Sequence, residues 1–200
     1  MRKSSAMKKS ILFYLLFVLP MLIACTDKYP QVVMETSYGN IVIEVYNDKA
    51  PVTANNLLRY VNENRFKGAV FYRVVTPDNQ PDNDIKIEVI QGGLFDDDHP
   101  DALPPIKHET TKETGVKHLD GIVSMARNEP GSASSEFFIC LGDQPELDFG
   151  GKRNPDGQGF AAFGRVVKGM DVVRKIQSLP AKDQMLLERI PIKFVKKGSR

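Results

Sequence analysis

The sequence has little cysteine and histidine, with two cysteines and three histidines among its 200 residues. The histidines (His99, His108 and His118) show neither zinc-ligand spacing nor the signature of a serine or cysteine partner. The acidic run DDDHPD over 96–101 lacks the spacing of a calcium loop. No glycine-rich phosphate loop is present either, so we expect neither a metal nor a cofactor.

An excess of charge of one sign is also lacking, since the formal net charge is +2. Four of the 27 basic residues precede the first acidic residue, Asp27, which leaves 23 basic against 25 acidic residues. This balance gives no electrostatic reason to expect nucleic-acid binding. With 42% hydrophobic residues, no repeat and no low-complexity segment, the chain is expected to form one globular domain.

No hydrophobic run is long enough to span a membrane. The longest, SILFYLLFVLPMLIAC, follows Lys8 and Lys9 and supplies about 15 apolar residues, fewer than the roughly 20 that a spanning helix needs. Such a run behind basic residues is typical of a signal peptide. Its last residues, LIAC, resemble a bacterial lipobox, which implies lipidation of Cys25 and cleavage before it. The alternative is an ordinary cleaved signal with a chance cysteine.

These features predict a lipoprotein signal peptide over 1–24, a short tether over 25–31 and a folded domain over 32–197. The expected location is the bacterial cell envelope, with the lipid on Cys25 in a membrane and the domain in the periplasm. Cys140 then has no cysteine partner. It lies in the probable buried strand EFFICLG, so we expect an inert thiol.

Two helices are predicted, far apart in the sequence. In the first, over 50–64, four apolar residues recur at helical spacing: Ala54, Leu57, Leu58 and Val61. Pro51 and Thr53 are the signals for its start. The second helix is predicted over 170–178.

The remaining periodic segments predict strands. Residues 31–46 resemble a hairpin that turns at 38–40. Further short strands are expected at 71–75, 87–91, 121–126, 136–141, 159–167 and 190–195, with an irregular stretch over 92–120. Roughly seven or eight short strands and two distant helices suggest a closed β-barrel with a helix over each end.

Two neighbouring strands each carry one polar side chain on an apolar face. Counting every second residue, Phe71, Arg73 and Val75 share one face of the first strand. The next strand repeats the pattern, with Gln91 following Val89. A guanidinium and an amide on apolar faces call for an explanation.

Six short pieces of sequence together resemble the cyclophilin family of peptidyl-prolyl isomerases. They are FYRVV (71–75), IQGG (90–93), GIVSMAR (121–127), SSEFFICLG (134–142), ELDFGG (146–151) and FAAFGRVVKGMDVV (160–173). They occur in the family's order and nearly at its spacing. The resemblance implies a mainly β fold, a closed eight-stranded antiparallel barrel capped by two α-helices. It also implies catalysis of rotation about the peptide bond before proline.

The resemblance implies a role for each matching residue. Arg73 would be the catalytic donor to the proline nitrogen, since arginine keeps its proton at physiological pH. Gln91 would orient Arg73, and Phe138 would floor the proline pocket while Phe137 packs inside. The other substrate-binding residues implied are Val89, Ala126, Arg127, Asn128, Glu136, Leu147 and Phe160. Without the family pattern, Arg73 would be interpreted as a surface-paired arginine, Phe138 as core and Gln91 as a backbone-bonded rim residue.

Several positions depart from the family. The segment TPDNQPDNDIK lengthens the span between Arg73 and Gln91, and NPDGQG lengthens the loop before Phe160. Glu88 stands where the family has a groove phenylalanine, so Ile87 or Val89 would supply that wall. Glu146, Phe160 and Glu136 replace a tryptophan, a histidine and a glutamine. We therefore expect a more acidic groove that disfavours acidic residues before proline and binds cyclosporin poorly.

The combined interpretation is a monomeric, membrane-tethered peptidyl-prolyl isomerase. Its partners would be proline-containing polypeptides, and its role would be to assist the folding of exported proteins. One alternative is a chaperone-like module that binds proline peptides with little turnover. A weaker alternative is a structural lipoprotein whose barrel only docks a partner.

Overall fold

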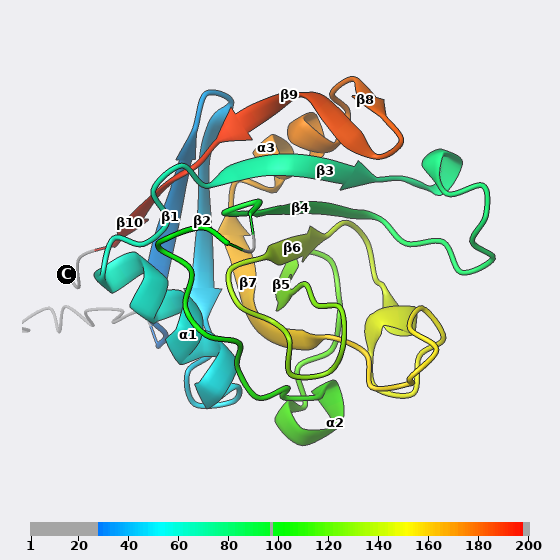
Figure 1. Cartoon of the computed structure of the whole chain (residues 1–200), viewed down its shortest axis with the longest axis horizontal. Coiled ribbons are helices and arrows are strands. Elements are labelled where there is room, and N and C mark those ends of the chain that lie inside the picture. Colours follow the sequence, from blue (N-terminus) through cyan, green and yellow to red (C-terminus); the bar gives the residue numbers. More distant parts are fainter. Residues whose placement is uncertain (1–27, 97, 198–200) are drawn as a thin grey trace, which may run out of the picture.

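The computed structural model describes residues 28–96 and 98–197, which form a mainly antiparallel β structure with three α-helices (Figure 1). The strands are β1 Gln31–Thr36, β2 Gly39–Val45, β3 Val70–Val75, β4 Val89–Gly93, β5 Ile122–Met125, β6 Phe137–Cys140, β7 Ala161–Lys168, β8 Ala181–Lys182, β9 Met185–Pro191 and β10 Lys193–Lys196. The helices are α1 Pro51–Asn62, α2 Thr111–Thr114 and α3 Met170–Gln177, with 3-10 turns η1 Pro77–Asn79 and η2 Pro145–Leu147. The expected signal peptide and Cys25 lie outside the described residues. No helix within the described residues is long and apolar enough to cross a membrane.

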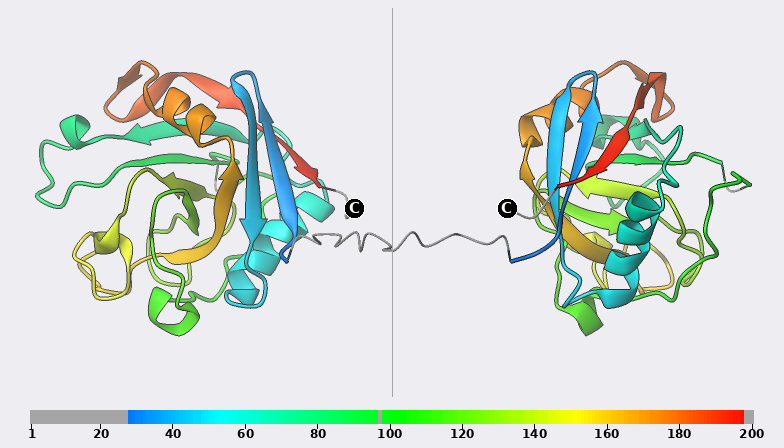
Figure 2. Two further views of the ribbon diagram at one scale, coloured as in Figure 1. Left: turned by 180° about the vertical axis from the view of Figure 1, so that it is seen from behind. Right: turned by 90° about the vertical axis from the view of Figure 1, so that its left-hand side faces the viewer.

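The strands form one sheet in the order β10-β1-β2-β7-β5-β6-β4-β3-β9-β8. Only Ile192 separates β9 from β10, yet β9 pairs with β3 whereas β10 pairs with β1. The chain itself therefore links the two sides of the curved sheet, as Figures 1 and 2 show. The expected class is confirmed, but the expected ring of eight strands needs correction. The described residues form ten strands, because the last expected strand bends into β9 and β10 and β8 is added. The hydrogen-bonded ladder among them does not close.

Two of the helices lie at opposite ends of the sheet, α1 against β7 and β10, and α3 against β2 and β4 (Figures 1 and 2). Both were expected. The one-turn helix α2 was not expected, and it lies within the 92–120 stretch that was predicted to be irregular. Thr110 caps it by accepting a hydrogen bond from the Glu113 amide at 3.3 Å, and the Glu113 carboxylate accepts from the Thr110 amide at 2.8 Å. The T-x-x-E pattern over 110–113 is the sequence signal that indicates the start of such a helix.

The start of α1 differs in part from the prediction. Pro51 occupies the first turn as expected, but the residue before the helix is Ala50, which has no capping side chain. Glu109 takes that role from a distant loop, because its carboxylate accepts from the Val52 amide at 3.1 Å and the Thr53 amide at 2.7 Å. The Thr53 hydroxyl also donates to Glu109 at 2.7 Å. A buried carboxylate at a helix N-terminus satisfies free amides and the helix dipole.

An irregularity in β3 decides which side chains reach the site. Phe71 pairs with Gly92 and Arg73 pairs with Gln91. Gly92 and Gln91 are adjacent on β4, so Tyr72 is an extra residue on β3 with no partner of its own there. Such a bulge breaks strict alternation. Phe71 is therefore buried in the main core, which corrects the expectation that it shares a face with Arg73. Glycine is required at Gly92, where a Cβ atom would lie 2.7 Å from the Val70 carbonyl oxygen.

Candidate active site

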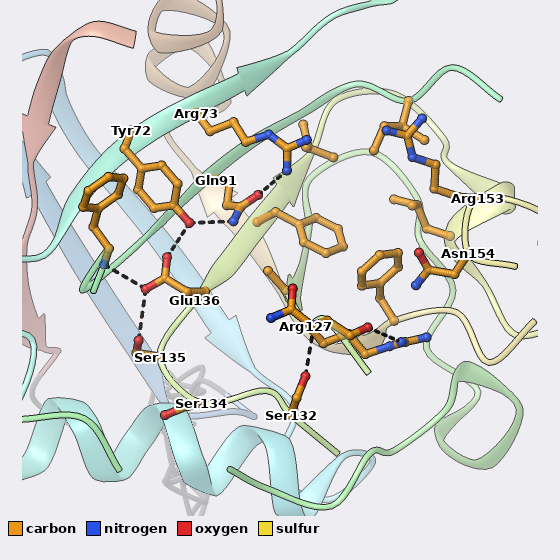
Figure 3. A pocket seen from close by; sticks show the side chains of 18 residues that line it. Tyr72, Arg73, Gln91, Arg127, Ser132, Ser134, Ser135, Glu136, Arg153 and Asn154 are labelled. Carbon is orange, nitrogen blue, oxygen red and sulfur yellow. Dashed lines mark hydrogen bonds between the residues drawn. The ribbon is translucent and has the colours of Figure 1, made fainter. Parts of the chain in front are cut away.

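A pocket of about 440 Å³ opens beside β3, β4 and β6 (Figure 3). It is lined by all ten residues that the sequence predicts as catalytic or substrate-binding. These are Arg73, Val89, Gln91, Ala126, Arg127, Asn128, Glu136, Phe138, Leu147 and Phe160. They come from separate parts of the chain, so the fold brings together what the six sequence pieces mark individually.

The floor of the pocket is apolar and separate from the main core. Phe138 and Leu147 pack there with Val75, and the Phe160 ring stands edge-on to Phe138 with centroids 5.2 Å apart. Phe137 packs in the main core instead, as the alternation along β6 predicts. A floor of this kind is suited to an apolar ring such as that of proline.

The thiol of Cys140 lies beneath this floor, fully buried and free. Burial raises its pKa well above the ordinary value. The expected inert cysteine is therefore in place, because a thiol with a raised pKa supplies little thiolate.

Arg73 is held by two amide oxygens at the edge of the pocket. Its Nη1 donates to Gln91 Oε1 at 2.9 Å, and its Nε and Nη2 donate to Gln184 Oε1 at 3.0 and 2.6 Å. Gln184 belongs to the β8–β9 turn and was not predicted, since no sequence signal links residues that far apart. Burial lowers the pKa of Arg73, but an arginine keeps its proton in proteins. The pair of acceptors fixes the guanidinium without neutralising it.

A hydrogen-bonded chain continues from Gln91 to Glu136 through Tyr72 (Figure 3). Gln91 Nε2 donates to the Tyr72 hydroxyl at 2.5 Å, and that hydroxyl donates to Glu136 Oε2 at 2.5 Å. Burial and then the charge of Glu136 raise the pKa of Tyr72 far above its ordinary value. Tyr72 therefore stays protonated. It reaches the site because of the bulge, which sequence reasoning did not foresee.

The negative charge of Glu136 is occupied within the protein. Its Oε1 accepts from the Phe95 amide at 2.9 Å and the Ser135 hydroxyl at 3.0 Å, in addition to the contact of Oε2 with Tyr72. Three donors on one carboxylate leave it little unmet demand for a ligand cation.

A buried histidine supports the floor from below, which the sequence did not predict. His118 is flanked by Asp148 Oδ1 at 2.9 Å from Nδ1 and by Ser124 Oγ at 2.9 Å from Nε2. Burial lowers the pKa of His118, although Asp148 opposes the shift. The neutral ring therefore donates from Nδ1 and accepts from Ser124. Its ring also stacks on Phe138 at 5.9 Å between centroids.

The sequence shows no signature of a serine partner for any histidine, yet the fold joins Asp148, His118 and Ser124 in one hydrogen-bonded chain. His118 and Ser124 are almost completely inaccessible to solvent. The serine therefore cannot meet a substrate, and the arrangement positions the pocket floor. Within the described residues, no group of three or more acidic, histidine or cysteine side chains could hold a metal ion.

The first lengthened segment contacts the residue that directly precedes the second at the pocket edge. That residue, Arg153, donates through Nη1 to Gln80 Oε1 at 2.9 Å and to the Ile85 carbonyl at 2.5 Å, both in the first segment. Gln80 is itself buried and bonds to the carbonyls of Thr76 and Ile87. Arg153 lines the pocket but was not predicted, because its position depends on contact with the first segment, which is distant in the sequence.

Arg127 contacts the second lengthened segment, over 154–159. It forms a two-pronged pair with Asp156, at 2.8 and 3.0 Å, and donates from Nε to the Gly159 carbonyl at 2.9 Å. Gly159 has a φ of +64°, and a Cβ there would lie 2.5 Å from the Leu147 carbonyl oxygen, so only glycine fits. The charge of Arg127 is therefore balanced inside the protein.

Of the three glutamates expected near the groove, Glu136 lines the pocket but the other two do not. Neither Glu88 nor Glu146 lines the pocket. Glu88 is near Gln177, whose amide nitrogen lies 3.4 Å from its Oε2, and Glu146 accepts from the Lys152 amide at 2.8 Å. Ile87 and Val89 do line it, as expected for the missing aromatic wall.

Comparison with known proteins shows the family to which this chain is similar. The family described as cyclophilin type peptidyl-prolyl cis-trans isomerase/CLD matches residues 31–197. A peptidyl-prolyl cis-trans isomerase of Acinetobacter baylyi is 38% identical over 82% of this chain and 80% of its own length. Peptidyl-prolyl cis-trans isomerase A of Dickeya dadantii is 36% identical over 81% of this chain and 78% of its own length.

A solved structure agrees with the fold. The cyclophilin type isomerase of Cryptosporidium parvum superposes with a TM-score of 0.67 and 21% identity, covering 86% of this chain and 99% of its own. The chain belongs to the cyclophilin-type peptidyl-prolyl cis-trans isomerase family. It is an enzyme of this class, which acts on proline-containing peptides.

Proposed function

We propose that Arg73 donates a hydrogen bond to the proline nitrogen while the X-Pro bond is twisted. Rotation about this bond has a barrier of about 18–20 kcal/mol, because it breaks amide resonance. Twisting returns a lone pair to the nitrogen, which then becomes an acceptor. A donor fixed beforehand stabilises this twisted state more than either planar state, and no covalent step is needed.

One observation carries the proposal: Arg73 is fixed by Gln91 and Gln184 at the edge of an apolar floor containing Phe138. Its partners are uncharged, so its donor strength is not spent on a carboxylate. A proline ring on the floor would bring its nitrogen toward the guanidinium. The expected binding roles of the remaining lining residues follow from the same placement, with the 126–128 segment along the pocket edge pairing with substrate backbone.

The proposed clients are exported proteins, and the proposed site of action is the surface of a membrane in the bacterial cell envelope, on the periplasmic side. The support is the apolar run that ends in LIAC and the short tether that follows Cys25. Only five residues lie between Cys25 and the start of β1 at Gln31. The domain would therefore work close to the lipid surface.

Turnover separates this proposal from a binding module. The full chain in detergent micelles is assayed with a cis-enriched X-Pro peptide and a protease that cleaves only the trans form. Nuclear magnetic resonance exchange measurements on the same peptide report binding and interconversion separately. The proposal predicts faster interconversion in both assays. Line broadening from binding, without faster cis–trans exchange, would instead favour the chaperone-like module.

A further inference from the structure

The charged side chains that line the pocket differ in whether the protein supplies them with partners of opposite charge or with hydrogen-bond donors. They are Arg73, Arg127, Arg153 and Glu136. Arg127 pairs with Asp156, and Glu136 accepts three hydrogen bonds. Among the residues that the structure describes, no carboxylate forms an ion pair with Arg73 or Arg153. The pocket therefore carries two positive charges without an internal counter-charge.

Arg153 is positioned by its neighbours and still has free donors. Its Nη1 is fixed between Gln80 Oε1 and the Ile85 carbonyl. In the described part of the chain, neither its Nε nor its Nη2 has a hydrogen-bond acceptor. Arginine presents its donors as a planar fork that matches a carboxylate. The guanidinium is thus fixed through Nη1, while Nε and Nη2 are available to a ligand.

Arg153 and Arg73 also influence each other. Burial, followed by the positive charge of Arg73, lowers the pKa of Arg153. Two like charges facing one pocket repel, so an anion placed between or beside them relieves that repulsion. Binding it breaks no existing ion pair, since the present partners of Arg153 are an amide and a backbone carbonyl.

We propose that Arg153 forms an anion-binding subsite beside the proline pocket, which selects peptides carrying an Asp or Glu side chain near the proline. This inference rests on the proposed isomerase function and names the substrate class that the site prefers. It reverses the preference expected from the sequence, because the glutamates lie outside the pocket or are occupied. Figure 3 shows Arg153 and Glu136 at opposite sides of the pocket, so the preference depends on where the acid stands relative to proline.

The lengthened segments have a function in this account. The first contributes Gln80 and Ile85, which hold Arg153, and the second begins directly after Arg153. Without the first segment, the printed contacts that fix this guanidinium at the pocket edge would be absent. A half-buried charge pair of this kind is expected to give about a three- to tenfold preference at low salt, and less at high salt.

The test uses the full chain in detergent micelles and peptides with Glu or its uncharged isostere Gln. The variable residue is placed at each of the two positions before and the two positions after proline. The ratio of kcat/KM for Glu and Gln is expected to exceed about three for at least one position, and to fall with added salt. In Arg153→Gln the ratio should fall to near one, and in Arg153→Lys it should partly persist.

Lys152→Gln is the matched control, because it removes the same charge from the exposed neighbouring residue. It should keep the wild-type ratio. Equal rates for Glu and Gln at all four positions would overturn the subsite, as would a ratio that survives in Arg153→Gln. Calorimetric binding of the same peptides gives the ratio without turnover. Absence of turnover with every peptide would therefore contradict the isomerase proposal separately from the subsite.

Discussion

Arg73 and Gln91 stand directly opposite each other on β3 and β4, with Arg73 Nη1 donating to Gln91 Oε1 across 2.9 Å. This pairing answers why two apolar strands each carry a polar side chain. The amide holds the guanidinium, and the guanidinium points into the pocket. The second side chain that holds Arg73, Gln184, lies 111 residues further along the sequence.

Removing the second holder should impair catalysis while leaving the fold intact. Gln184→Met keeps the size of the side chain but removes both acceptor contacts to Arg73. We expect kcat/KM to fall about tenfold, since a lost hydrogen bond to a charged group is worth at least about 1.5 kcal/mol. Asp183→Asn in the same turn is the control and should match the wild type. Unchanged turnover in Gln184→Met would mean that Gln91 alone suffices to orient Arg73.

Stability should fall in mildly acidic solution because of His118. Burial lowers the pKa of this ring below its usual 6.5, so below that pH the unfolded chain binds a proton that the folded chain does not. The free energy of unfolding should then decrease by up to about 1.4 kcal/mol per pH unit, until the folded-state pKa is reached.

Urea unfolding at a series of pH values measures this slope in the wild type and in His118→Asn. The variant should be less stable at pH 8 but should lose part of the slope. The ring resonances of His118 should titrate only below pH 6.5. A ring that titrates above that value would show that the pair with Asp148 outweighs burial.

Glu109 should stabilise α1 from outside the helix. Glu109→Gln removes the charge that accepts from the Val52 and Thr53 amides. We expect a loss of about 1–2 kcal/mol in the free energy of unfolding, in the range of other helix N-terminal contacts. Glu129→Gln makes the same chemical change at an exposed position and should cost little. Equal stability of the two variants would mean that Glu109 contributes nothing beyond an ordinary surface glutamate.

The sequence predicted the parts of the site that depend on local alternation and family pieces. Phe137 and Phe138 were correctly assigned to opposite faces of one strand. The parts it missed depend on contacts between distant segments. Tyr72 reaches the pocket through a bulge, and Arg153 is held there by contact with the distant 76–86 segment.

The same limit explains the errors in the fold and in the charge of the groove. Pairing of β9 and β10 with different strands is a long-range event, so the strand count could not be read from periodicity. Glu88 and Glu146 were assigned to the groove by position in a motif. Instead, Glu146 accepts from the Lys152 backbone amide, and Glu88 lies beside Gln177.

Membrane attachment should depend on Cys25. Cys25→Ser removes the thiol that a lipid would modify, and the protein should move from the membrane fraction to the soluble fraction. In the lipidated protein, the six residues 25–30 would hold the domain within about 20 Å of the bilayer, at roughly 3.5 Å per residue. Metabolic labelling with a radioactive fatty acid gives the chemical readout. Equal labelling of wild type and Cys25→Ser would contradict the lipobox interpretation.

The most direct test of the account is the isomerisation rate of Arg73→Ala. Removal of a positioned donor at an electrostatic site should lower kcat/KM by about 10²–10³, while circular dichroism and peptide binding stay close to wild type. Arg174→Ala, an exposed arginine on α3, is the control and should retain full activity. Near-wild-type turnover by a folded Arg73→Ala protein would contradict the central claim that the guanidinium stabilises the twisted peptide bond.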